Sequence, residues 1–77
     1  MPNWQVGRER TMRVLAKDVR IGDKFYDSFH EELFQVSHID KVEHTTLYNF
    51  WTFPVERPRA GTMIFTKDHD DQLELRN

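Results

Sequence analysis

The sequence predicts a mainly all-β domain of about five or six antiparallel strands, with at most one short helical turn. Apolar and polar residues alternate over most of the chain, which is the period of a half-buried strand. Branched and aromatic residues, which favour strands, are concentrated in residues 45–53 and 62–67. The 77 residues suffice for one domain. We expect residues 1–10 to form a flexible arm and residues 11–77 to form a small β-barrel domain.

The first predicted strand opens this domain. Met12, Val14 and Ala16 share one face and alternate with polar residues, although Leu15 interrupts the pattern. Strand-forming residues resume at residues 24–26. The first two strands are therefore separated by a short polar connection.

That connection, residues 17–23 with the sequence KDVRIGD, predicts a corner. It is too polar and too short for a helix of ordinary length. We expect Asp18 to cap a single helical turn and Gly22 to adopt a conformation that a Cβ would disfavour. Val19 and Ile21 are expected to point inward and to fill one end of the barrel.

Residues 27–32, DSFHEE, are compatible with two structures. Ser28 and Glu31 have the spacing of a helix capping box, which would favour a short helix. The next ten residues are rich in branched and aromatic side chains, which favours a hairpin loop leading into a strand. We expect the hairpin loop.

The apolar residues of the following strand change parity. Phe34 and Val36 have the same parity, but the next apolar residue is Ile39. A shift of one residue inside a strand is typical of a β-bulge or a sharp bend. Small barrels need such bends to close on themselves, so this feature supports a barrel.

The stretch TTLYNFWTF, residues 45–53, carries aromatic side chains on both faces of its predicted strand. We expect Leu47, Trp51 and Phe53 to face the core, and Tyr48 and Phe50 to lie on the exposed face.

The remainder of the chain predicts a loop and a last hairpin. Residues 54–61 contain two prolines, which cannot donate to a strand ladder, and predict a loop. Residues 62–67 form the next strand. An acidic turn at residues 68–71 joins it to a final strand with Leu73 and Leu75 on one face, and these two strands are predicted to pair.

The formal net charge is −2, so the chain as a whole does not attract nucleic acid by bulk electrostatics. The charge is unevenly distributed: residues 1–24 have a net charge of +3 and residues 25–56 one of −5. The chain has no cysteine, so it has neither disulfides nor thiolate metal sites. No apolar run approaches the roughly 20 residues that span a bilayer. We expect a soluble, cytoplasmic protein.

The polar residues do not predict a catalytic, metal or cofactor site. A phosphate-binding loop needs several glycines and a following helix, whereas Gly22 stands alone and a strand follows it. The four histidines and the DHDD turn lack the spacing of zinc or calcium ligands. No serine or threonine lies in a recognisable nucleophile motif. We therefore expect no enzyme activity, no metal and no cofactor.

An aromatic strand followed by arginines gives the strongest binding signal. Aromatic side chains and arginine dominate protein–protein contact sites, and they also stack on bases and hold phosphates. A role in the core is the alternative for the aromatics, because a small β domain has few other large residues to fill its interior. We expect binding to another protein, with nucleic-acid binding and self-association as alternatives. The candidate binding residues are Tyr48, Phe50, Arg57, Arg59, Arg10, Arg13 and Trp4.

Three segments together resemble a known group of sequences: VLAKDVRIGDKF at 14–25, FQVSHIDKV at 34–42 and GTMIFTKDHDDQLEL at 61–75. They resemble short uncharacterised small-β-barrel proteins of actinobacteria and their phages, in which the first corner carries an A-x-D-(V/L)-x-x-G-D motif. The residues that match this motif are Ala16, Asp18, Val19, Gly22 and Asp23. The resemblance implies a Src-homology-three-like barrel, closed or partly open, and a phage-encoded accessory protein without enzyme activity. A related motif begins some self-splicing barrels, but these need a nucleophilic cysteine or serine at the start of the domain, which this chain lacks.

Overall fold

The computed structural model describes residues 11–77, which form one antiparallel sheet of six strands. The strands are β1 (Met12–Leu15), β2 (Lys24–Asp27), β3 (Glu32–Lys41), β4 (Leu47–Pro54), β5 (Met63–Asp68) and β6 (Gln72–Leu75). Two short 3-10 turns, η1 (Ala16–Asp18) and η2 (Pro58–Ala60), are the helical elements of this part of the chain. The all-β prediction is confirmed, although there are two helical turns where at most one was expected.

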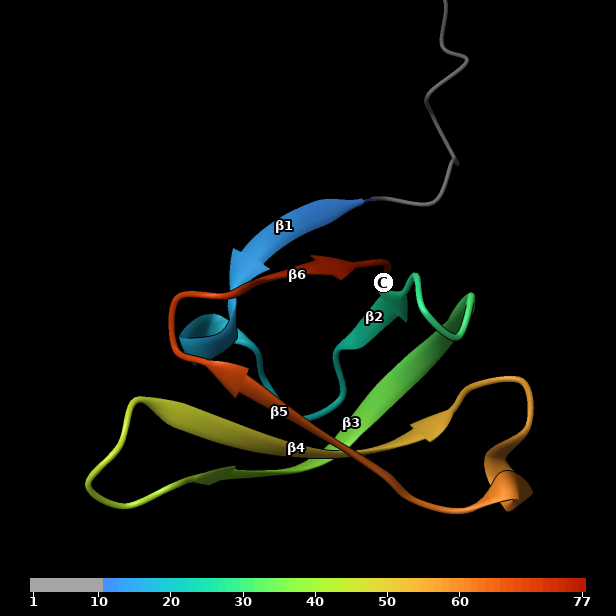
Figure 1. Cartoon of the computed structure of the whole chain (residues 1–77). Coiled ribbons are helices and arrows are strands. Elements are labelled where there is room, and N and C mark those ends of the chain that lie inside the picture. Colours follow the sequence, from blue (N-terminus) through green and yellow to red (C-terminus); the bar gives the residue numbers. More distant parts are fainter. Residues whose placement is uncertain (1–10) are drawn as a thin grey trace, which may run out of the picture.

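The sheet has the strand order β1-β6-β2-β3-β4-β5 and is not closed into a complete barrel. Figure 1 shows the long β3 crossing from the half that contains β2, β6 and β1 to the half that contains β4 and β5. The sheet thus folds over on itself as a partly open barrel, with the core between the two halves. Within residues 11–77, no helix has the length and apolar character needed to cross a membrane.

The predicted last hairpin is wrong. β5 and β6 follow one another in the chain, but β5 pairs with β4, whereas β6 lies between β1 and β2. Backbone hydrogen bonds to the β5–β6 turn hold this end of the barrel: the Ala16 amide donates to the Asp71 carbonyl at 2.7 Å, and the His69 amide donates to the Thr46 carbonyl at 2.7 Å. The turn therefore bridges the two halves of the sheet.

The corner after β1 is partly as predicted. Val19 is buried and Gly22 has a φ of 97°, as expected, whereas Ile21 is 64% exposed and does not point inward. Asp18 ends η1 and does not cap it. The corner is closed instead by Asp23, whose Oδ2 accepts a hydrogen bond from the Arg20 amide at 2.9 Å. The predicted capping role of Asp18 is therefore wrong, and the Asp23 side chain closes the turn at residues 20–23 instead.

The β2–β3 connection and the bend in β3 confirm two predictions. Residues 28–31 form a turn, and the Asp27 carboxylate accepts a hydrogen bond from the His30 amide at 2.8 Å. The pairing of β3 with β4 shifts register between Val36 and His38, which is the predicted bulge. The hydroxyl of the intervening Ser37 donates to the Trp51 carbonyl at 3.1 Å.

The core is a single apolar cluster with aromatic rings at its centre. Phe65 lies edge-to-face against Phe25 and Phe34, with ring centroids 5.1 and 5.0 Å away. Thr52 is the buried polar residue of this cluster, and its hydroxyl donates to the Met63 carbonyl at 2.8 Å. The buried apolar members are Ala16, Val19, Phe25, Phe34, Val36, Phe50, Leu73 and Leu75.

The two faces of β4 are the reverse of those predicted. Phe50 is 0% exposed and Tyr48 packs against the core, whereas Leu47, Trp51 and Phe53 lie half-buried on the outer face. Alternation could not decide between the faces because both carry aromatic residues. Pairing with β3 decides: the buried Val36 lies opposite Thr52, and residues opposite one another project to the same face.

Candidate binding surface

The outer face of the β3–β4–β5 part carries a row of three cross-strand neighbours. His38 pairs with Trp51, and Trp51 pairs with Ile64. The rings of His38 and Trp51 meet edge-to-face, with centroids 5.1 Å apart. Ile64 is 52% exposed and adjoins Trp51 across the strands. We call these three residues the outer row.

The outer row ends at an edge of the sheet. Among residues 11–77, β5 has a strand neighbour on one side only, which is β4. A strand in this position offers unpaired backbone N–H and C=O groups along its free side. The free edge and the exposed Ile64 thus occur on the same six-residue strand.

The two aromatic candidates within residues 11–77, Tyr48 and Phe50, do not form an exposed surface. Tyr48 stacks on Phe50 inside the barrel, with ring centroids 6.2 Å apart and an interplanar angle of 17°. Phe50 is part of the core, so its prediction as a binding residue is wrong. We expected Trp51 in the core and made no prediction for Ile64. Both lie on the outer face. The parity of Phe34 and Val36, carried across the bulge to β4, was the signal that could have found them.

The predicted arginines within residues 11–77 lie on two separate parts of the molecule: Arg57 and Arg59 in the loop after β4, and Arg13 on β1. Arg57 is held by Glu32: its Nη2 donates to Oε1 at 3.0 Å and to Oε2 at 2.5 Å. The hydrogen bond from Arg57 lowers the pKa of Glu32 below its ordinary value, and the same contact raises the pKa of the guanidinium. Arg59 is exposed in η2. Arg57 therefore ties the start of β3 to the loop after β4.

Arg13 is on β1, at the opposite end of the sheet order from β5. Figure 1 shows β1 well separated from the loop that contains η2. Trp4 and Arg10 lie outside the described residues. The described candidates are consequently not one continuous aromatic and arginine surface.

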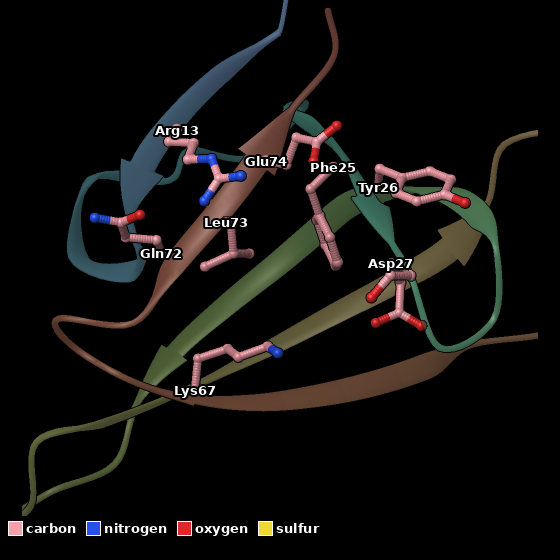
Figure 2. Close-up of a pocket in the computed structure, with 9 residues that line it drawn as sticks. Arg13, Phe25, Tyr26, Asp27, Lys67, Gln72, Leu73 and Glu74 are labelled. Carbon is pink, nitrogen blue, oxygen red and sulfur yellow. The ribbon is translucent and has the colours of Figure 1, made fainter.

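Arg13 instead lines a cavity of about 250 Å³ at the opening of the barrel. Figure 2 shows this opening between β5 on one side and β2 and β6 on the other, with Phe25 and Leu73 projecting into it. Charged side chains surround it: Arg13 from β1, Lys67 from β5, and the carboxylates of Asp27 and Glu74.

The β5–β6 turn brings together side-chain atoms of Asp68, His69 and Asp70 of the kind that can hold a metal ion. These atoms lie within 4.8 Å of one another. His69 Nδ1 is 2.8 Å from Asp68 Oδ1, and this hydrogen bond is the main cause of the lowered pKa of Asp68. The Asp68 amide also donates to Asp71 Oδ2 at 2.8 Å. Closure of the turn accounts for these contacts.

No protein-family model, no curated protein and no solved structure matches the chain.

Proposed function

We propose that this chain is a non-enzymatic protein-binding module that docks an extended segment of another protein along β5. The observation that carries the proposal is the exposure of Ile64, an apolar residue next to Trp51 on an edge strand. Apolar side chains that adjoin one another at the surface of a small domain tend to mark an interface, whereas isolated ones are common. The proposal retains the expectation of a phage-encoded accessory protein of the cytoplasm with a Src-homology-three-like barrel.

Strand addition provides the affinity and the outer row provides the specificity. An extended segment that pairs with β5 would satisfy the unpaired backbone groups of its free edge. Every second side chain of that segment would lie on the outer face, next to Ile64. An apolar side chain there would extend the apolar surface that begins at Trp51.

Electrostatics support a protein partner more than nucleic acid. Among residues 11–77, acidic side chains outnumber basic ones twelve to nine. Arg57, one of the arginines assigned to phosphate contacts, already has a carboxylate partner in Glu32. A phosphate would have to compete with that ion pair.

The test is capture of partners by the immobilised full chain, with two matched isoleucine variants. Ile64→Lys places a charge on the outer row, whereas Ile21→Lys makes the same change at an isoleucine on the corner that is exposed to 64%, against 52% for Ile64. We expect Ile64→Lys to lose a partner that both the wild type and Ile21→Lys retain. If Ile64→Lys retains every captured partner, the outer row is not the binding surface.

Two further measurements separate the alternatives. Nucleic-acid binding would be weakened steeply by salt, because phosphate contacts release counterions. Self-association through β5 would appear in sedimentation as a dimer that Ile64→Lys dissociates. Either result, without a captured protein that depends on Ile64, would replace the proposed function.

A further inference from the structure

The opening of the barrel contains a lysine on its inward-facing side. Residues of β5 alternate between the two faces of the sheet, and Met63 and Phe65 pack against the core. Lys67 follows Phe65 by two residues and continues this inner row, half-buried, with its Nζ 5.9 Å from the centre of the Phe65 ring. Its half-buried stem carries the ammonium group to the opening of the barrel.

Lys67 and Arg13 have no carboxylate partner in the described part of the chain. Neither takes part in an ion pair or a side-chain hydrogen bond with another of residues 11–77. The two side chains come from β5 and β1, the strands at the two ends of the sheet. Figure 2 shows them on opposite sides of the opening, separated by Leu73.

The two carboxylates in the same cavity already have other partners. Glu74 Oε2 accepts hydrogen bonds from Arg76, from Nε at 2.8 Å and from Nη2 at 2.5 Å. Asp27 Oδ2 is 2.5 Å from His30 Nδ1 and also accepts the His30 amide. The cations of the cavity thus remain available, while its anions are engaged at its rim.

We infer that this opening binds a carboxylate group, held between Arg13 and Lys67 at the mouth of the cavity, above the buried Phe25 and Leu73. The planar guanidinium of Arg13 can donate two hydrogen bonds to the carboxylate oxygens, and the ammonium of Lys67 adds a second positive charge beside them. A carboxylate suits the site better than a phosphate because Asp27 and Glu74 would repel a doubly charged anion more strongly. A cavity of about 250 Å³ has room for the carboxylate group.

The carboxylate could belong to a small free acid or to an acidic side chain of an extended segment along β5. Both sources have the same chemistry at Arg13 and Lys67. The inference does not depend on the outer row, because Lys67 and Ile64 project to opposite faces of β5. Binding of a carboxylate at the opening can therefore be supported or refuted independently of the partner-capture test at Ile64.

The experiment is a titration of the full chain, followed by the amide shifts of Arg13, Lys67 and Leu73 in NMR spectra. The free-acid probe is propionate, with propionamide as its uncharged counterpart. The peptide probe is acetyl-Val-Glu-Val-amide, with acetyl-Val-Gln-Val-amide as its counterpart. For such small ligands we expect a dissociation constant on the order of 1 mM.

Binding of both acidic probes would support the inference and assign a free acid as a sufficient ligand. Binding of the acidic peptide alone would also support it and would show that the carboxylate must be presented on an extended chain. Binding of neither, equal binding of the amide counterparts, or saturation by inorganic phosphate in preference to both would overturn it.

Variants distinguish a ligand role from a structural role. Lys67→Met keeps the stem that covers Phe65 but removes the charge, and it should weaken carboxylate binding about fivefold, as should Arg13→Gln. Lys41→Met, on an exposed part of β3 outside the cavity, is the matched control and should bind as the wild type does. If folded Lys67→Met and Arg13→Gln both bind unchanged, the assignment to these two residues is wrong.

Discussion

Replacing Phe50 by leucine tests which face of β4 supports the core. Phe50 is 0% exposed and stacks with Tyr48, so the smaller side chain would leave a cavity and lose apolar contacts. The loss of three carbon atoms, at about 0.8 kcal/mol for each buried carbon group, gives about 2 kcal/mol of lost stability. For a domain of this size, that loss would lower the melting temperature by roughly 8–16 °C.

The matched variant is Trp51→Leu, the neighbouring aromatic on the opposite face. It removes more atoms, but from a half-buried side chain, so fewer core contacts are lost per atom. We expect urea denaturation to show a larger loss of stability for Phe50→Leu than for Trp51→Leu. If Trp51→Leu is the more destabilising of the two, the original assignment of the faces is right and the register described for β3 and β4 is not.

Two further predictions concern the corner and an ion pair. Gly22→Ala should destabilise the domain by about 1 kcal/mol in urea denaturation, because a residue with a Cβ resists the φ of 97° at this position. A steric clash does not contribute, since no atom lies within 4 Å of the added Cβ. An unchanged denaturation midpoint would mean that the backbone of the corner relaxes. The pKa of Glu32 is lowered by its hydrogen bond from Arg57, so its contribution to stability is complete above its ordinary pKa of 4.5 and is lost as the pH falls through the lower folded value. Stability should therefore fall less steeply below pH 4.5 in Glu32→Gln than in the wild type, and equal pH profiles would contradict a role for this carboxylate.

Local patterns were sufficient to predict several elements. The parity change between Val36 and Ile39 predicted the bulge, because an extra residue in a strand always reverses which side chains face the core. Gly22 predicted a positive φ because residues with a Cβ resist that conformation. Alternation predicted that Leu73 and Leu75 share one face of a strand, and the structure buries both. In each case the physical cause acts over a few neighbouring residues.

Non-local pairing decided what these patterns left open. Both faces of β4 are apolar enough to be buried, and only the register with β3 placed Phe50 inside. β6 follows β5 after a short turn, yet it pairs with β1 and β2 because the sheet folds over on itself.

The candidate sites depended on the same non-local pairing. Trp51 and Ile64 are thirteen positions apart in the sequence, and it is the pairing of β4 with β5 that makes them neighbours. Lys67 and Arg13 line one cavity, although they come from the strands at the two ends of the sheet, because the sheet folds over on itself. The sequence thus determined that this chain forms a β domain with a bent third strand, and the tertiary structure determined which side chains that domain leaves available for binding.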